Sequence, residues 1–130
     1  MLVIDASVAL TASMTCDGFS RLAPFDLVAP PLLWSETLST LREHAWRRDI
    51  SVELAAASHD ALLRAPIRRR APAALYVEAW RVAEELGWAK TYDAEYVALA
   101  RLLKCRLLTR DERLRHGASR VVEVIGPREL

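Results

Sequence analysis

The chain has 130 residues, which is enough for one domain and leaves little for a second. Hydrophobic residues make up 52% and charged residues 27%, so a core can form and disorder is not expected. The formal net charge of +1 excludes a strongly basic protein that binds nucleic acid through bulk charge alone. We therefore expect a single domain over residues 1–130.

Neither export nor membrane insertion is expected from the sequence. Asp5 interrupts the first apolar run where the core of a signal peptide would build up. No apolar run approaches the roughly 20 residues that cross a bilayer. Cys16 and Cys105 match no metal-ligand spacing, and two isolated thiols are typical of a reducing compartment. These features predict a cytoplasmic protein with no membrane association.

Short apolar runs alternate with helical patterns through the N-terminal half. Leu2-Val3-Ile4 predicts a buried strand that ends at Asp5, and a second short strand is predicted over residues 26–29. The spacing of apolar residues predicts helices over residues 7–14, 32–48 and 51–64. Residues 67–70 include three consecutive arginines between two prolines, and we expect a solvent-exposed connector there.

The C-terminal half continues the same alternation. Helices are predicted over residues 73–86, where Gly87 is a natural end, over 93–104, and as a single turn over 111–115. Strands are predicted over residues 106–109 and 121–125. Strands separated by helices require parallel crossovers. The expected fold class is therefore α/β, a three-layer α/β/α sandwich with a short central parallel sheet.

Four acidic residues occupy positions that folding would bring together. Asp5 and Asp111 each follow a predicted strand, and ligands bind at the carboxyl ends of parallel strands. Asp93 begins the helix that leads back to the strand at residues 106–109. Glu36 lies in the first turns of the helix at residues 32–48. We expect these carboxylates to face one edge of the sheet.

Carboxylates gathered at one edge repel each other unless a cation lies between them. Mg²⁺ takes one or two carboxylates directly and keeps several waters, and such a site can activate water for a phosphoryl displacement. Simpler roles remain open at this point. Asp5 and Asp93 fit helix N-caps, and Thr109 with Glu112 fits a capping box in which Asp111 only stabilises the helix dipole.

Four segments of the chain resemble the motifs of PIN domains. They are VIDAS at residues 3–7, WSETLSTL at 34–41, YDAEYVALA at 92–100 and LLTRDERL at 107–114. Their order, their spacing and the total length are similar to those of VapC-type toxins. The second motif often carries Asn three residues after its acid, where this chain has Ser39. The resemblance covers nearly the whole chain.

The resemblance implies a metal-dependent endoribonuclease. Asp5 and Asp93 would be the first-choice Mg²⁺ ligands, and Glu36 and Asp111 would complete the acidic pocket, partly through water. Ser7, Ser39 and Thr109 would support the carboxylates by hydrogen bonding. Hydrolysis of RNA would leave a 5′-phosphate, and Mn²⁺ is the alternative ion because it shares the oxygen ligands of Mg²⁺.

The resemblance also implies partners and a location. Toxins of this type pair with a small VapB-like antitoxin, form homodimers and act on RNA in the bacterial cytoplasm. Arg110 and Arg113 lie close to Asp111 in the sequence, and they are candidates to contact the RNA backbone because phosphate contacts supply most non-specific affinity.

Two other interpretations are left open by the sequence. A catalytically inactive PIN-like module that binds RNA or protein is compatible with Ser39 in the second motif. A receiver domain or an aspartyl phosphatase would also use an acidic pocket, but such phosphatases need a second Asp two residues after the first. Ser7 occupies that position here.

Overall fold

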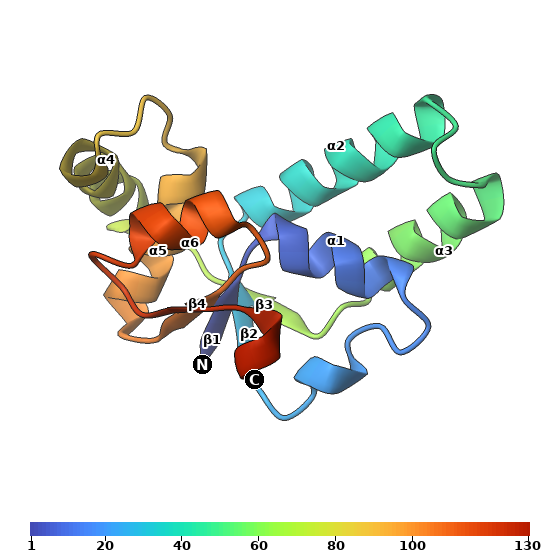
Figure 1. Cartoon of the computed structure of the whole chain (residues 1–130), viewed down its shortest axis with the longest axis horizontal. Coiled ribbons are helices and arrows are strands. Elements are labelled where there is room, and N and C mark those ends of the chain that lie inside the picture. The colour runs from blue at the N-terminus through green and yellow to red at the C-terminus, as the bar shows by residue number, and fades with distance from the viewer.

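A computed structural model describes residues 1–130, and it is built around one parallel sheet of five strands (Figure 1). The order of the strands across the sheet is β3-β2-β1-β4-β5, and all four neighbouring pairs are parallel. The strands are β1 (Leu2–Ile4), β2 (Leu27–Ala29), β3 (Ile67–Arg69), β4 (Arg106–Leu108) and β5 (Val124–Ile125).

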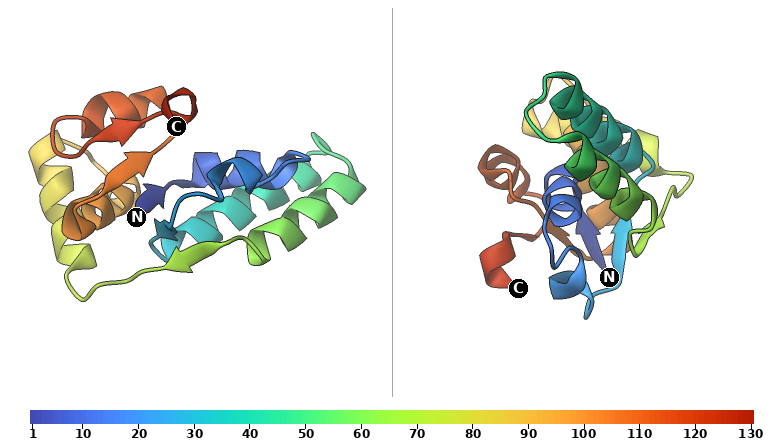
Figure 2. Two further views of the ribbon diagram at one scale, coloured as in Figure 1. Left: turned by 90° about the horizontal axis from the view of Figure 1, so that it is seen from below. Right: turned by 90° about the vertical axis from the view of Figure 1, so that its right-hand side faces the viewer.

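Helices cover both faces of this sheet. They are α1 (Ala6–Met14), α2 (Leu32–Trp46), α3 (Val52–Leu63), α4 (Leu75–Leu86), α5 (Tyr92–Leu103) and α6 (Glu112–Ala118). The helices α1, α2 and α3 pack together, while α4 packs on α5, and α5 packs on β1 and β4. The hairpin of α2 and α3 and the helix α4 lie at opposite ends of the molecule (Figures 1 and 2). This arrangement confirms the predicted α/β sandwich.

The central strands are short but completely buried. The residues of β1 and β2 are at most 2% exposed, because helices cover the sheet on both faces. A strand buried on two faces reads as a continuous apolar run, which is how β1 was recognisable in the sequence. These strands belong to a core cluster of 29 buried residues. None of the helices has both the length and the apolar character needed to cross a bilayer.

The connector predicted at residues 67–70 is wrong, because Ile67–Arg69 forms the edge strand β3. Only Ile67 is buried, so the strand has no apolar run that could reveal it. Arg68 forms a double hydrogen bond with Asp26, at 2.6 and 3.0 Å, and Arg69 lies 4.8 Å from the ring centre of Trp34. The arginines therefore cover the edge of the sheet.

The predicted boundaries in the C-terminal part need correction as well. The helix predicted over residues 111–115 continues as α6 to Ala118. The strand predicted over residues 121–125 is limited to Val124–Ile125, since the residues before it form a turn. At the other helix ends the agreement is close, and Gly87 ends α4 in the left-handed conformation (φ 70°).

Candidate functional site

The candidate site lies where two adjacent central strands end. In the register of the sheet, Ile4 of β1 pairs with Leu108 of β4. The next residues are Asp5 on one strand and Thr109 on the other, followed shortly by Asp111. The carboxyl ends of β1 and β4 therefore deliver two of the predicted acidic residues to one edge of the sheet, as parallel topology requires.

The carboxylate of Asp5 is buried and held by three donors. Ser7 donates its hydroxyl to Asp5 Oδ1 at 2.6 Å, the backbone N–H of Val8 donates to the same oxygen at 3.2 Å, and Thr109 donates its hydroxyl to Oδ2. Asp5 is 4% exposed, and burial raises the pKa of its carboxyl despite these hydrogen bonds, with repulsion from Asp93 adding to the effect. Asp5 therefore acts as the N-cap of α1, and its carboxyl group is held in a fixed position away from solvent.

Asp111 and Asp93 occupy the first turns of two other helices. Asp111 is the N-cap of α6, because its Oδ1 accepts hydrogen bonds from the backbone N–H groups of Arg113 (2.9 Å) and Leu114 (3.3 Å). The capping box considered for Thr109 and Glu112 does not form, since the Thr109 hydroxyl bonds to Asp5 and accepts from the backbone of Asp111. Asp93 does not cap α5 either. Its carboxylate is free for another role.

Glu36 is held from across the fold by a residue that the sequence interpretation missed. The buried Tyr96 of α5 donates its hydroxyl to Glu36 Oε1 at 2.6 Å. Ser39, expected to support the carboxylates, is exposed and makes no side-chain hydrogen bond with Glu36. It lies instead beside Arg42 and Trp46. The available signal for Tyr96 was its hydroxyl at the start of the apolar run at residues 96–100, since a buried tyrosine hydroxyl usually finds a partner.

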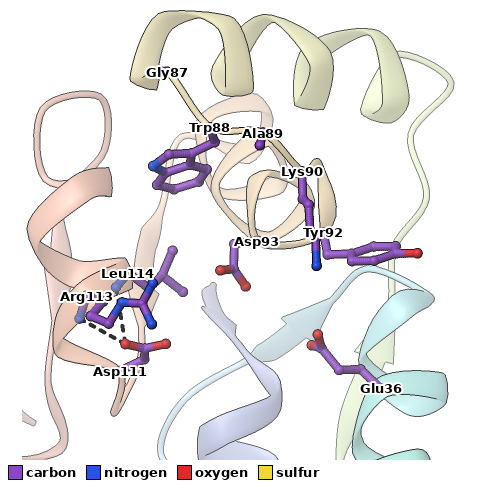
Figure 3. Close-up of a pocket in the computed structure, with 10 residues that line it drawn as sticks. All are labelled: Glu36, Gly87, Trp88, Ala89, Lys90, Tyr92, Asp93, Asp111, Arg113 and Leu114. Carbon is purple, nitrogen blue, oxygen red and sulfur yellow. Dashed lines mark hydrogen bonds between the residues drawn. The ribbon is translucent and has the colours of Figure 1, made fainter.

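The carboxylates of Glu36, Asp93 and Asp111 line one open pocket of about 620 Å³ (Figure 3). Figure 3 shows their side chains pointing into the same space, from α2, α5 and the start of α6. Asp5 is not among the lining residues, but it lies close enough to Asp93 and Glu36 for their charges to interact. Folding therefore brings the four predicted acidic residues to one place in the molecule.

Mutual repulsion links these carboxylates. Loss of solvent and repulsion from Asp111 raise the pKa of Asp93, while Arg113 acts in the opposite direction. Burial raises the pKa of Glu36, opposed by the Tyr96 hydrogen bond and reinforced by Asp93 and Asp5. The cluster is therefore unfavourable without a cation to offset it.

The donor set fits a hard divalent cation. All the donors are carboxylate oxygens, which Mg²⁺ and Mn²⁺ prefer, whereas no cysteine or histidine lines the pocket. No three acidic, histidine or cysteine side chains are grouped closely enough to hold a metal ion by themselves. An open site of this kind is typical of Mg²⁺, which needs only one or two direct carboxylates and completes its octahedron with water and substrate oxygens.

The two arginines expected to contact RNA are placed differently. Arg113 lines the acidic pocket, whereas Arg110 lines a cavity next to α1 and the C-terminal residues. The backbone N–H of Arg110 donates to Ser7 Oγ at 3.1 Å, which gives this residue a structural contact with the loop that holds Asp5. Lys90 also lines the acidic pocket, and nothing in the sequence pattern identified it.

Comparison with known proteins agrees with these motifs. The model of the PIN domain matches residues 2–119. A VapC ribonuclease of Mycobacterium bovis, Mb0985, is 36% identical over 116 residues, which is 88% of this chain and 88% of the relative. The ribonuclease VapC9 of Mycobacterium tuberculosis has the same identity and coverage.

Solved structures show the same fold. PAE2754 from Pyrobaculum aerophilum superimposes with a TM-score of 0.74 at 24% identity, covering 98% of this chain and 91% of that one. FitAcB from Neisseria gonorrhoeae gives a TM-score of 0.64 at 18% identity and covers all of both chains. With its family model, its relatives and its fold in agreement, the chain belongs to the PIN-domain family, among the relatives of the VapC ribonucleases.

Proposed function

We propose that this protein is a Mg²⁺-dependent endoribonuclease that serves as the toxin of a toxin–antitoxin pair. Its relatives are named VapC ribonucleases, and the chain is a phosphodiester hydrolase of the same kind. The observation that carries the proposal is the meeting of Asp5, Glu36, Asp93 and Asp111 at the carboxyl edge of the sheet. PIN-domain ribonucleases generally depend on a divalent metal ion, and this donor set is suited to one.

In this proposal Asp5 and Asp93 bind the ion directly, and Glu36 and Asp111 hold it through water. Mn²⁺ has the same ligand preferences and can take its place. When bound, such an ion activates water and offsets the charge of an in-line phosphoryl displacement.

The residues around the carboxylates fix their positions before substrate arrives. Ser7 and Thr109 hold both oxygens of Asp5, and Tyr96 holds one oxygen of Glu36, leaving the other free to orient water. Arg113 contributes a positive charge beside Asp111, where it is placed to bind an RNA phosphate. Arg110 contacts the RNA backbone farther from the carboxylates, because it lines a different cavity.

Cleavage by the purified protein tests the proposal. The parent cuts RNA with Mg²⁺ or Mn²⁺, loses this activity in EDTA and leaves 5′-phosphate ends. Asp93→Asn abolishes both cleavage and growth arrest on expression, while Asp17→Asn, at an exposed aspartate away from the pocket, keeps them. An Asp93→Asn protein that still cuts RNA and stops growth contradicts the proposal.

A catalytically inactive module that binds RNA or protein remains the second candidate. The observation in its favour is Ser39, which stands where the second motif often carries Asn and is exposed, without a side-chain hydrogen bond to Glu36. A purified chain that binds RNA but cuts none with Mg²⁺ or Mn²⁺ supports this candidate over the nuclease.

We also propose that the protein works in the cytoplasm as a homodimer and binds a VapB-like antitoxin. Large apolar side chains remain exposed on the α2–α3 hairpin, namely Trp46, Val52 and Leu63. Such surfaces are common at protein interfaces. Light scattering of the purified chain, alone and with the product of an adjacent small gene, tests both assemblies. A monomer at all concentrations excludes the homodimer.

A further inference from the structure

The segment between α4 and α5 forms a wall of the acidic pocket. Trp88, Lys90 and Tyr92 all line the pocket, and they come from a stretch of five residues that ends directly before Asp93. Figure 3 shows Lys90 and Tyr92 side by side near Glu36, with Arg113 on the opposite side near Asp111. Positive charge therefore flanks the carboxylates from two directions.

Trp88 fixes this wall to the rest of the fold. A Cβ atom added to Gly117 of α6 would lie 2.9 Å from Cζ2 of the Trp88 indole, so the two residues are in close contact. Only glycine leaves room for the ring at this position, although glycine is unfavourable inside a helix. The indole is half-buried in this contact, and the wall therefore exists before any ligand binds.

No polar interaction within the protein involves the side chains of Tyr92 and Lys90. The Tyr92 side chain is 57% exposed, and neither its hydroxyl nor the Lys90 amine makes a hydrogen bond or an ion pair with the protein. Tyr96, one helical turn later, is buried and bonded to Glu36. The exposed ring and the free ammonium at the rim of the acidic pocket are therefore available to a ligand.

We propose that Lys90 and Tyr92 form a nucleotide subsite next to the cleavage position. The Tyr92 ring stacks on a base of single-stranded RNA, and the Lys90 ammonium binds a backbone phosphate. Bases of unpaired RNA stack on exposed aromatic rings, and lysine binds phosphate as a point charge. The subsite rests on the proposed function, and it selects an unpaired nucleotide on the Glu36 side of the metal carboxylates.

The chain offers a matched control for each residue. Tyr92→Leu removes the ring, Tyr92→Phe keeps it, and Tyr76→Leu removes an equally exposed ring on the outer face of α4. Lys90→Gln is matched by Lys104→Gln, because these are the two lysines of the chain and Lys104 lies outside the pocket. All these side chains are exposed, so folding is expected to be retained.

Binding of a short fluorescent single-stranded RNA is measured by anisotropy, with Ca²⁺ replacing Mg²⁺ and the strand checked for cleavage. Tyr92→Leu weakens binding about 5- to 100-fold, whereas Tyr92→Phe and Tyr76→Leu stay close to the parent. An abasic strand removes the difference between Tyr92→Leu and the parent. Lys90→Gln reduces the slope of log affinity against log salt concentration by about one, the value for one phosphate contact, and Lys104→Gln leaves the slope unchanged.

Equal affinities for Tyr92→Leu and Tyr76→Leu overturn the subsite, and so does a parent protein that binds no single-stranded RNA. The result of this binding experiment does not depend on whether the protein cleaves RNA. A parent that binds RNA without cutting it with Mg²⁺ disproves the nuclease function, while the same variants still report on the subsite.

Discussion

The hydroxyl of Tyr96 donates to Glu36 Oε1 at 2.6 Å, and this contact connects α5 to α2 at the acidic pocket. The two residues are 60 positions apart in the chain, so the contact depends on the packed fold. It explains how Glu36 is oriented although the position three residues later is occupied by the exposed Ser39.

Tyr96→Phe keeps the buried ring and removes only this hydrogen bond. We expect RNA cleavage to fall about 10-fold, as is typical when a residue that orients a metal ligand is lost. The variant should also need a higher concentration of Mn²⁺ than the parent to reach the same increase in melting temperature. Ser39→Ala is the control, because the exposed Ser39 side chain makes no hydrogen bond with Glu36, and it should leave both quantities unchanged. Equal behaviour of the two variants would show that Tyr96 does not position Glu36.

Asp93→Asn should lower RNA cleavage while raising the stability of the metal-free protein. It removes a carboxylate that Asp111 repels, so the metal-free protein should melt at a higher temperature than the parent in EDTA. Cleavage should fall by more than the roughly 10- to 100-fold loss typical of outer-shell partners. Calorimetry in EDTA and a cleavage assay in Mg²⁺ measure the two effects. A lower melting temperature in EDTA would argue that Asp93 has a stabilising partner.

Glu95 is a buried carboxylate without a use in the proposed mechanism. The residue is 8% exposed, its carboxylate makes no hydrogen bond or ion pair with the protein, and burial and repulsion from Glu36 raise the pKa of this carboxyl. Glu95→Gln should therefore increase the free energy of unfolding by more than the roughly 0.5 kcal/mol typical of surface substitutions. The exposed Glu84→Gln, measured by urea denaturation in parallel, should be close to neutral.

The metal-free protein should become more stable as pH falls from neutrality towards the ordinary carboxyl pKa range of about 4. The folded state raises the pKa of Asp5, Glu36 and Asp93, so it binds protons more tightly than the unfolded chain does. Stability is then lost as pH rises through these folded-state pKa values. Urea denaturation in EDTA at several pH values measures the slope, and saturating Mg²⁺ should reverse it. A flat profile in EDTA would mean that the carboxylates do not repel each other appreciably.

Gly117→Ala tests the anchor of the pocket wall. Alanine is favoured over glycine in a helix by about 1 kcal/mol, but its Cβ would lie 2.9 Å from the Trp88 ring. We expect the clash to dominate, giving a lower melting temperature and weaker RNA binding. Gly117→Ala in a Trp88→Leu background should instead be stabilising, because the clash is gone. A stabilising effect in the parent background would show that the indole moves aside easily.

The central strands and the acidic positions were predictable because local chemistry determines them. A strand buried on two faces must be apolar, and residues at or shortly after its carboxyl end lie at the ligand-binding edge, which placed Asp5 and Asp111. The edge strand β3 was missed for the opposite reason. Its two arginines are exposed and paired with Asp26 and Trp34, so the segment has the polarity of a loop.

The contacts between distant segments were not predictable from local patterns. The spacing of Tyr96 within its helix does not reveal that its hydroxyl reaches α2, and the position of Lys90 in a loop does not reveal that the loop lines the pocket. Both depend on how α5 packs, which is decided by the whole core. The prediction for Ser39 was wrong for the opposite reason. Ser39 is close to Glu36 in sequence, but its side chain is exposed and makes no hydrogen bond with Glu36.

The central position of β1 has a consequence for biosynthesis. Because β1 pairs with β4, and Asp5 is held by Thr109, the site cannot assemble until the ribosome has made and released nearly the entire polypeptide. A nascent chain is therefore harmless to the cell that translates it. Premature termination before β4 gives a product without the enzymatic centre, so truncated fragments are not expected to be poisonous.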